Sequence, residues 1–159
     1  MQCSGIGYDV HRFVTGRPLI LGGVDVPYDR GLDGHSDADV LCHAIADAVL
    51  GALGLNDIGF YFPPDDESIK GISSLVILRK VCQLAKENDA EIHNIDSTLI
   101  VEQPKILPHV EAMKLNISEA LGIDRSQVGV KATTNELMGA IGRGEGIAAM
   151  AVASIEIRN

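Results

Sequence analysis

Apolar residues recur along this chain at two different periods, one typical of helices and the other of strands. They recur every three or four positions in three segments, which we predict to be helices: residues 36–54, 73–85 and 108–122. The boundary residues agree with this interpretation. Ser-Asp and Ser-Ser pairs open the first two segments, Pro108 stands where a first helical residue would, and Gly54 and Gly122 follow the apolar stripes.

Other segments alternate in polarity or are rich in β-branched residues, and we predict them to be strands. They are residues 2–11, 92–101, 128–134 and 147–157. Residues 19–28 are typical of a hairpin with Gly22-Gly23 as its turn. The stretch around Pro63-Pro64 and the glycine-rich residues 135–146 are predicted to be loops.

The order of these elements indicates the fold class. Helices and strands do not alternate strictly, so a doubly wound parallel sheet is not indicated. We predict an α+β fold, a mixed β-sheet with helices packed on one face, in a single domain over residues 1–159. The helices are too few to cover both faces of such a sheet, and the uncovered face favours assembly with further copies of the chain.

The charge balance narrows the range of partners. The chain has 13 basic and 22 acidic residues and a formal net charge of −9, so nucleic acid is not an expected partner. No uncharged apolar run approaches roughly 18 residues, so we expect no membrane span. The cysteines, Cys3, Cys42 and Cys82, form no C-x-x-C pair, which favours buried free thiols in a reducing, cytoplasmic compartment.

Asp9-Val10-His11 is the first candidate for metal chemistry. Side chains two positions apart on a strand point to the same side, so Asp9 and His11 converge as metal ligands must. The alternative is a surface carboxylate beside an ordinary hydrogen-bonded histidine, which is the commoner case for so short a motif.

A second group of candidates lies on the first predicted helix. Asp39 and Asp47 flank His43 at i−4 and i+4, so the three share one helix face. This is either a solvated polar stripe or a metal-binding His43 whose second ring nitrogen is held by a carboxylate, for which we favour Asp47. With the strand pair, His43 completes a one-carboxylate, two-histidine set that leaves the fourth position of a zinc ion open, as catalytic zinc requires. Cys42 is an alternative ligand, but it is turned about 100° from His43.

The third candidate combines residues 131–136 with the glycine-rich residues 142–146. Hydroxyls at a strand end, glycine N–H groups and Arg143 all suit phosphate oxygens, and Glu136 suits a hard divalent ion. The alternative for each of these features, taken alone, is a turn that binds no ligand. Residues 104–108 form a proline-framed loop, which either presents backbone groups to a nucleobase or only connects a strand to a helix.

Taken together, these stretches resemble the cyclodiphosphate synthases of the non-mevalonate isoprenoid pathway over nearly the whole chain. The matching residues, in order, are 7–12, 18–23, 35–37, 39–40, 57–59, 62–63, 104–105, 131–134 with Glu136, and 142–146. The resemblance implies a homotrimer whose sheets gather around a three-fold axis, with each active site between two subunits.

The resemblance also implies a reaction. The substrate would be 4-diphosphocytidyl-2-C-methyl-D-erythritol 2-phosphate, whose 2-phosphate attacks the diphosphate and expels CMP. The product would be 2-C-methyl-D-erythritol 2,4-cyclodiphosphate. The implied cofactors are Zn²⁺ on Asp9, His11 and His43, and Mg²⁺ or Mn²⁺ on Glu136.

By the same resemblance, further residues contact this cytidine diphosphate substrate. The implied catalytic residues are His35, Ser36, Asp57, Thr134 and Glu136. The implied binding residues are His35 and Ser36 for phosphate, Asp57, Gly59, Phe62 and Asp66 for the methylerythritol, Lys105, Ile106 and Leu107 for cytosine, and Ala132, Thr133, Thr134 and Arg143 for the nucleotide phosphates, beside the zinc ligands Asp9 and His11.

The chain departs from the family pattern at three places. Residues 62–66 read F-P-P-D-D, where many members have F-P-D-T-D. Ala38 replaces the usual glycine, and residues 138–141 lack a bulky aromatic that is usual near the expected axis. Two rival functions belong to other classes: a trimeric nucleotide- or phosphate-binding module without turnover, and a metal-dependent phosphohydrolase that uses zinc-bound water.

Overall fold

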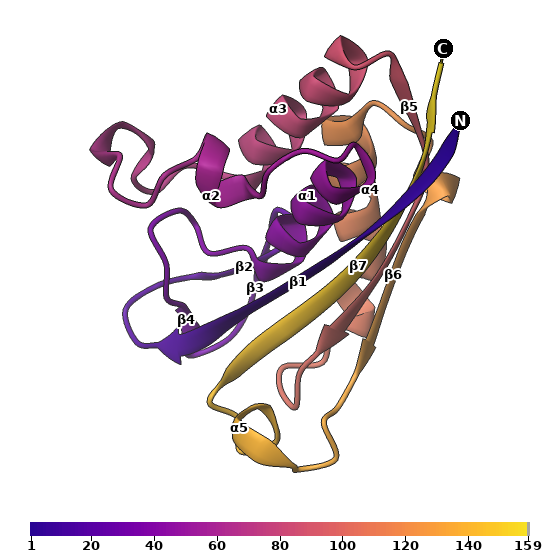
Figure 1. Cartoon of the computed structure of the whole chain (residues 1–159). Coiled ribbons are helices and arrows are strands. Elements are labelled where there is room, and N and C mark those ends of the chain that lie inside the picture. Colours follow the sequence, from indigo (N-terminus) through magenta and orange to yellow (C-terminus); the bar gives the residue numbers. More distant parts are fainter. Residues whose placement is uncertain (159) are drawn as a thin grey trace.

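The computed structural model describes residues 1–158, and its frame is a five-stranded sheet in the order β4-β1-β7-β5-β6 (Figure 1). The long strand β1 (Gln2–Val14) pairs antiparallel with β7 (Gly146–Ile157), and β7 pairs antiparallel with β5 (Ala90–Ile100). β6 (Val128–Thr133) runs parallel to β5, and the short β4 (Gly31–Leu32) closes the other edge antiparallel to β1. The predicted mixed sheet is confirmed.

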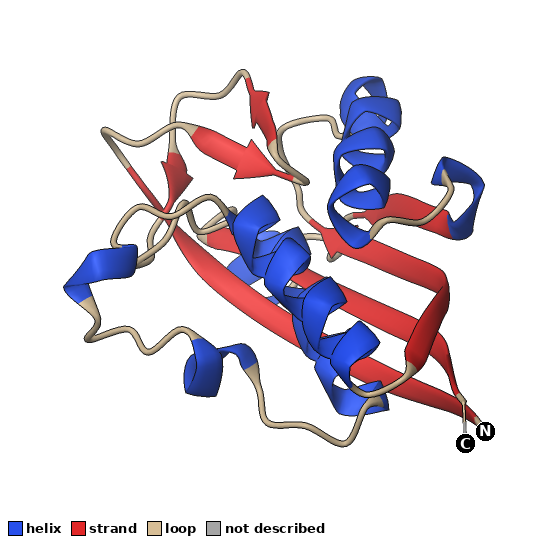
Figure 2. Ribbon diagram, turned by 90° about the horizontal axis from the view of Figure 1, so that it is seen from above, coloured by secondary structure: helices blue, strands red, loops and turns tan. Residues whose placement is uncertain are grey.

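The three predicted helices lie on one face of this sheet, as Figures 1 and 2 show. They are α1 (Val40–Ala52), α3 (Ser74–Glu87) and α4 (Val110–Leu121). α1 is buried along almost its whole length because it packs against β1 and β7 below it and against α3 beside it. The apolar stripes that predicted these helices therefore form the core, and the prediction of helices on one face is confirmed.

The opposite face of the sheet carries exposed apolar side chains. On β1 every second residue points away from the helices, and Ile6, Tyr8 and Val10 are all exposed there. On the neighbouring strand β7, Met150 lies opposite Tyr8 and Val152 lies opposite Ile6, and both are exposed. Five apolar side chains thus form one patch on the face that the helices leave uncovered.

The first helix begins later than predicted, at Val40 rather than at residues 36–37. Its N-cap is Asp39, whose carboxylate accepts a hydrogen bond from the Cys42 N–H at 3.1 Å. The same buried carboxylate accepts the Gly22 and Gly23 N–H groups at 3.0 and 2.7 Å. Asp39 therefore joins the helix to the turn of the hairpin formed by β2 (Leu19–Leu21) and β3 (Val24–Val26), instead of lying on a solvated stripe.

Several short elements have no counterpart in the prediction. They are α2 (Ile58–Tyr61), α5 (Gly139–Gly142) and the 3₁₀ turns η1 (Glu67–Ile69), η2 (Leu107–His109) and η3 (Arg125–Gln127). Pro108 lies in one of these turns, directly before α4, so it does not begin the α-helix itself. Each element spans only three or four residues, too few to show a period in the sequence.

Two glycines on β1 allow α1 to lie directly on the strand. A Cβ atom on Gly7 would be 1.8 Å from the Ala44 carbonyl oxygen, and one on Gly5 would be 2.1 Å from that of Ala48. No side chain fits at either position. His43 is the neighbour of Ala44 on the helix. The close approach of α1 to β1 therefore brings His43 within reach of Asp9, which lies two residues beyond Gly7.

The two ends of the described chain lie side by side at the same end of the sheet (Figure 1). Gln2 pairs with Glu156, and the Met1 ammonium group donates to the Ile157 carbonyl at 2.6 Å. Within residues 1–158, no helix is both long and apolar enough to cross a bilayer. The cysteines are free, with Cys42 and Cys82 buried as predicted and Cys3 partly so.

Candidate active site

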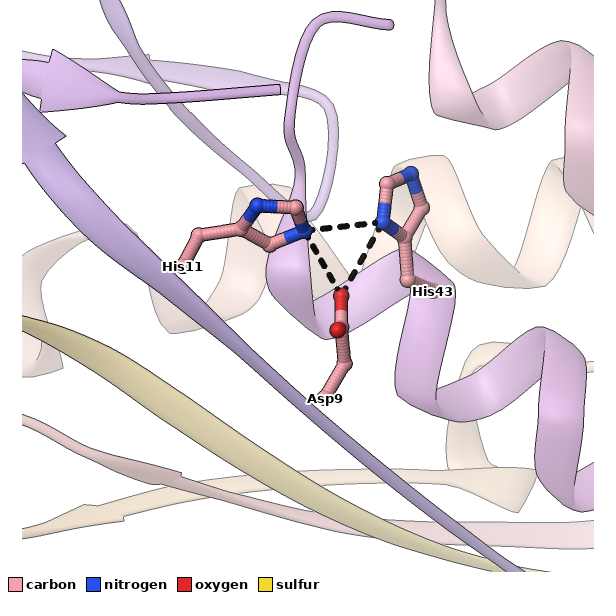
Figure 3. A group of neighbouring side chains, drawn as sticks. All are labelled: Asp9, His11 and His43. Atoms are coloured by element: carbon pink, nitrogen blue, oxygen red, sulfur yellow. Dashed lines mark hydrogen bonds and ion pairs between the residues drawn. The ribbon is translucent and has the colours of Figure 1, made fainter. Parts of the chain in front are cut away.

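Asp9, His11 and His43 form a compact group between β1 and α1 (Figure 3). The Asp9 Oδ2 atom lies 2.8 Å from His11 Nε2 and 3.0 Å from His43 Nδ1. The two ring nitrogens are 3.3 Å apart. The alternation of β1 brings Asp9 and His11 to one side, and α1 supplies His43 from above, as the sequence predicted.

The outer nitrogen of each histidine is held by the surrounding chain. His11 Nδ1–H donates to the Asp33 carbonyl oxygen at 2.6 Å, which leaves the Nε2 lone pair directed at the group. His43 Nε2 lies 2.9 Å from the Ser74 hydroxyl and 3.2 Å from the Ser36 hydroxyl. Because Ser74 donates its own proton to the Asp37 carboxylate, His43 Nε2–H donates to Ser74, and Nδ1 keeps its lone pair for the group.

This arrangement corrects one prediction. The expected partner of the second His43 nitrogen was a carboxylate on the same helix, Asp47, but the Asp47 carboxylate instead accepts the Ile58 N–H at 2.9 Å. The carboxylate that supports His43 is Asp37, and it acts through the Ser74 hydroxyl. A helical period identifies residues on one face, but these partners come from a preceding loop and a different helix.

The electrostatics of the group favour a cation. Partial burial by itself raises the pKa of Asp9, but its hydrogen bonds to His11 and His43 outweigh this and hold the pKa well below its ordinary value. Burial lowers the pKa of His11, and its hydrogen bond to Asp9 more than reverses this, so the net shift is upward. Both shifts have the sign expected when an ionised carboxylate stabilises a neighbouring positive charge.

The donor set fits a zinc ion. One carboxylate oxygen and two imidazole nitrogens are ligands that zinc prefers, and a tetrahedral ion separates such atoms by about 3.3 Å. The observed spacings of 2.8, 3.0 and 3.3 Å are close to this value. Each outer nitrogen is already anchored, as is usual for metal-ligating histidines. Three protein ligands leave one position for another group.

A cavity of about 220 Å³ opens beside the group and is lined by both histidines. Residues 35–36 and the loop that follows α1 complete it: His35, Ser36, Gly59 and Phe62 all line its wall. His35 Nε2 lies 2.9 Å from the Asp66 carbonyl oxygen, and the Asp57 carboxylate caps α2 through the Phe60 N–H. The structure thus gathers these predicted phosphate- and methylerythritol-binding residues, with Asp57 and Asp66 on the adjoining loop.

The residues predicted to bind the cytidine diphosphate lie elsewhere in the same chain. β1 and β6 are separated by β7 and β5, so Thr133 at the end of β6 is about 14 Å across the sheet from β1. Ala132, Thr134, Glu136 and Arg143 are exposed on this side, as are Lys105 and Leu107. Ile106 is only 3% exposed and belongs to the core, so its main chain alone can face a base. A single chain therefore does not bring the nucleotide-side residues together with Asp9, His11 and His43.

Sequence reasoning missed two residues that shape the site. Ser74 was assigned only to a helix start, because nothing in its neighbours connects it with His43. Arg17 donates to the carbonyl oxygens of Gly34 and Ser36, both at 2.6 Å, and so holds the loop that carries His35. Both contacts are long-range, and no local period or spacing in the sequence indicates them.

A mixed sheet with helices on one face and an Asp-His-His group beside a mostly apolar cavity defines the chain as an α+β enzyme with a candidate metal centre. The model of the YgbB family matches residues 3–156. The chain therefore belongs to the YgbB family, whose curated members similar to it are named 2-C-methyl-D-erythritol 2,4-cyclodiphosphate synthases.

Curated relatives are similar over nearly their full length. The chain is 61% identical to the 2-C-methyl-D-erythritol 2,4-cyclodiphosphate synthase of Akkermansia muciniphila over 153 residues, which cover 96% of this chain and 90% of the relative. It is 56% identical to the synthase of Alkaliphilus metalliredigens, with 95% of each chain covered. The expected family membership is confirmed.

Solved structures share the fold. The bifunctional IspDF of Campylobacter jejuni superposes with a TM-score of 0.95 at 39% identity and covers the whole of this chain. The chain spans only 43% of that larger protein. A Plasmodium falciparum structure described as an IspF CDP complex superposes with a TM-score of 0.87 at 35% identity, covering 99% of this chain and 97% of that one.

Proposed function

We propose that the chain converts 4-diphosphocytidyl-2-C-methyl-D-erythritol 2-phosphate into 2-C-methyl-D-erythritol 2,4-cyclodiphosphate and CMP, as a phosphorus–oxygen lyase of isoprenoid precursor synthesis. The observation that carries the proposal is the Asp9-His11-His43 group, with both histidine lone pairs directed inward, in a chain 61% identical to a synthase of that name. The reaction forms a bond from the 2-phosphate oxygen to the outer phosphorus and breaks the bond from that phosphorus to the CMP oxygen.

The chemical demand of this step is alignment and charge neutralisation. The attacking phosphate oxygen is already anionic, so the protein needs no general base. Zn²⁺ held by Asp9, His11 and His43 would supply fixed positive charge beside the cavity, and Mg²⁺ or Mn²⁺ held by Glu136 would supply it beside the diphosphate. The chain itself is strongly acidic, so this local charge matters for binding a polyanion.

Ser36 and His35 would orient the phosphate. The Ser36 hydroxyl oxygen accepts the Ala38 N–H at 3.1 Å and lies beside His43 Nε2, so its own proton is free to donate into the cavity. His35 lines the same wall and is fixed by the Asp66 carbonyl. Asp57, Gly59, Phe62 and Asp66 would bind the methylerythritol, which needs hydroxyl partners and an apolar wall.

The cytidine diphosphate would bind to the second group of residues. We assign Lys105, Ile106 and Leu107 to the cytosine, Ala132, Thr133 and Thr134 to the nucleotide phosphates, and Arg143 to phosphate. The description of a similar structure as a CDP complex supports a cytidine nucleotide as the ligand. Thr134 and Glu136 lie together, because Glu136 N–H donates to the Thr134 hydroxyl at 3.3 Å.

We propose that the chain acts as a homotrimer in the cytoplasm, with each active site shared by two subunits. Two observations support this assembly. The zinc-side and nucleotide-side residues are separated across the sheet of one chain, and the uncovered sheet face carries the apolar patch of Ile6, Tyr8, Val10, Met150 and Val152. An apolar patch of that kind is typical of an interface.

Product analysis tests the function. Zinc-loaded protein is incubated with the substrate and Mg²⁺, and ³¹P NMR follows the phosphorus signals. A cyclic diphosphate together with CMP is the expected result. Inorganic phosphate in place of the cyclic product would favour the rival hydrolase, and unchanged substrate that nevertheless binds would favour the binding module.

A further inference from the structure

The loop that carries Glu136 has an unusual backbone. Glu136 and the next residue, Leu137, both have positive φ angles, 51° and 60°. Residues with a side chain rarely adopt this left-handed conformation, and two in succession are rarer still. Neither is a glycine, and both side chains are exposed, so core packing does not hold the loop in place. Something else must offset the steric cost.

Glu102 supplies the missing interaction. Its Oε1 atom accepts the N–H of Asn135 at 2.9 Å and the N–H of Leu137 at 3.2 Å. Glu102 lies two residues after the end of β5. Val101, between them, still donates its N–H to the Thr133 carbonyl at 2.9 Å, so Glu102 is level with the start of the loop. One carboxylate oxygen thus gathers two of the N–H groups that flank Glu136.

The remaining N–H group of this turn is also fixed. Glu136 N–H donates to the Thr134 hydroxyl at 3.3 Å, and that hydroxyl lies 3.5 Å from the Glu136 carboxylate. The N–H groups on either side of Glu136 therefore bind the Glu102 carboxylate, and the N–H of Glu136 itself binds the Thr134 hydroxyl, so the backbone of the turn is fixed at three consecutive residues.

We infer that Glu102 is a positioning residue for Glu136: it holds the left-handed backbone that aims the Glu136 carboxylate and the Thr134 hydroxyl at the same side. The inference rests on the proposed function, in which Glu136 holds a divalent ion at the diphosphate. Glu102 is partly buried, and its Oε1 atom binds two backbone amides of the loop, so we assign its effect on Glu136 to the loop backbone.

Glu102→Gln and Glu102→Ala separate this role from a simple charge effect. The glutamine keeps a carbonyl oxygen that accepts both N–H groups, whereas the alanine removes the acceptor. We expect Glu102→Ala to weaken Mn²⁺ binding to the zinc-loaded, CDP-bound protein by about 10- to 100-fold, measured by electron paramagnetic resonance. The Mn²⁺ affinity of Glu102→Gln should stay within about threefold of the wild-type affinity. Backbone hydrogen exchange at residues 134–138 should accelerate in the alanine variant alone.

Three results would overturn the inference. The first is wild-type Mn²⁺ affinity and exchange in Glu102→Ala. The second is a glutamine variant as weak as the alanine one, because the carboxylate would then act by charge. The third is unchanged Mn²⁺ binding in Glu136→Ala, which would remove the proposed role of Glu136 and the inference with it. Loss of Mn²⁺ in Glu136→Ala but not in Glu102→Ala would refute the positioning role only.

Discussion

The Ser74 hydroxyl lies 2.9 Å from the Nε2 atom of His43, and the two residues come from different helices 31 positions apart. Ser74 in turn donates to Asp37, so a carboxylate supports the histidine through a hydroxyl. The two consecutive hydrogen bonds that link Asp37, Ser74 and His43 fix which ring nitrogen of His43 faces Asp9. Ring orientation at the candidate zinc site thus depends on how α3 packs against α1.

We therefore expect Ser74→Ala to weaken zinc binding by about 10-fold, because loss of a group that orients a metal-ligating histidine typically costs 10- to 100-fold and Ser36 still contacts the same nitrogen. Competition with a chromophoric chelator measures the effect. Ser73→Ala is the matched control: Ser73 caps the same helix through the Leu75 N–H but does not touch His43. Equal zinc affinity in the two variants would contradict the orienting role.

Zinc binding should weaken as the pH falls. Burial lowers the pKa of His11, but the hydrogen bond to Asp9 outweighs burial and the net pKa lies above its ordinary value of 6.5. Below that raised pKa the metal-free site holds a proton that zinc must displace. Below the raised pKa the affinity should fall by about tenfold for each pH unit, and above it this dependence should disappear. Chelator competition measured from about pH 6 upward follows this change. A flat profile there would show that no proton leaves when zinc binds.

Gly7→Ala should destabilise the protein and disturb the metal site together. The new Cβ would be 1.8 Å from the Ala44 carbonyl oxygen, so α1 must move away from β1 and carry His43 with it. We expect a loss of about 1–3 kcal/mol in the free energy of unfolding, the usual cost of overpacking. Zinc affinity should fall in the same variant.

Gly51→Ala is the control on the same helix. A Cβ there has no contact closer than 3.8 Å, and replacing a helical glycine by alanine usually stabilises by about 0.5–1 kcal/mol. Urea denaturation compares the two variants. If Gly7→Ala were as stable as Gly51→Ala, the close contact between β1 and α1 would not matter for the fold.

The apolar patch on the uncovered sheet face predicts the effect of a charge there. Met150→Glu should convert the proposed trimer into smaller species, because a carboxylate would be buried without a partner. Leu115→Glu, on α4, is the control, since both side chains are 44% exposed in the single chain. Light scattering gives the mass of each variant. A trimer that survives Met150→Glu but not Leu115→Glu would place the interface on the helix side.

Mixed trimers test whether a site is shared. His43→Ala should lose zinc binding and activity, and Glu136→Ala should lose activity, because each variant lacks one half of the proposed site. When the two inactive proteins are dissociated, mixed and reassembled, some interfaces receive an intact zinc half and an intact nucleotide half. Activity should therefore recover in part. No recovery in trimers shown by mass to be mixed would mean that one chain builds the whole site.

How far the sequence predicts this structure depends on the range of each interaction. The Asp9–His11 pair and the position of His43 follow from local periods, because a strand repeats every two residues and a helix every 3.6. The helices are predicted for the same reason. The start of α1 is not, because Asp39 caps the helix while also binding Gly22 and Gly23 of a distant hairpin.

The parts of the site that escape prediction all depend on contacts between distant segments. Ser74 reaches His43 from another helix, and Glu102 binds a loop more than 30 residues away along the chain. The left-handed conformation of Leu137 is hidden in the sequence because leucine rarely adopts it. The sequence therefore predicts which residues carry the chemistry better than which residues hold them in place.

The pairing of the two chain ends has a consequence for how this unit joins others. Met1 and Ile157 meet at one end of the sheet, and Asp9 lies eight residues beyond Met1 along β1, about 26 Å away. A second domain fused at either end would thus be attached far from the metal ligands and would not need to deform the strands that carry them. The fold is compatible with modular joining, and in the bifunctional Campylobacter jejuni protein a unit of this shape accounts for 43% of a longer chain.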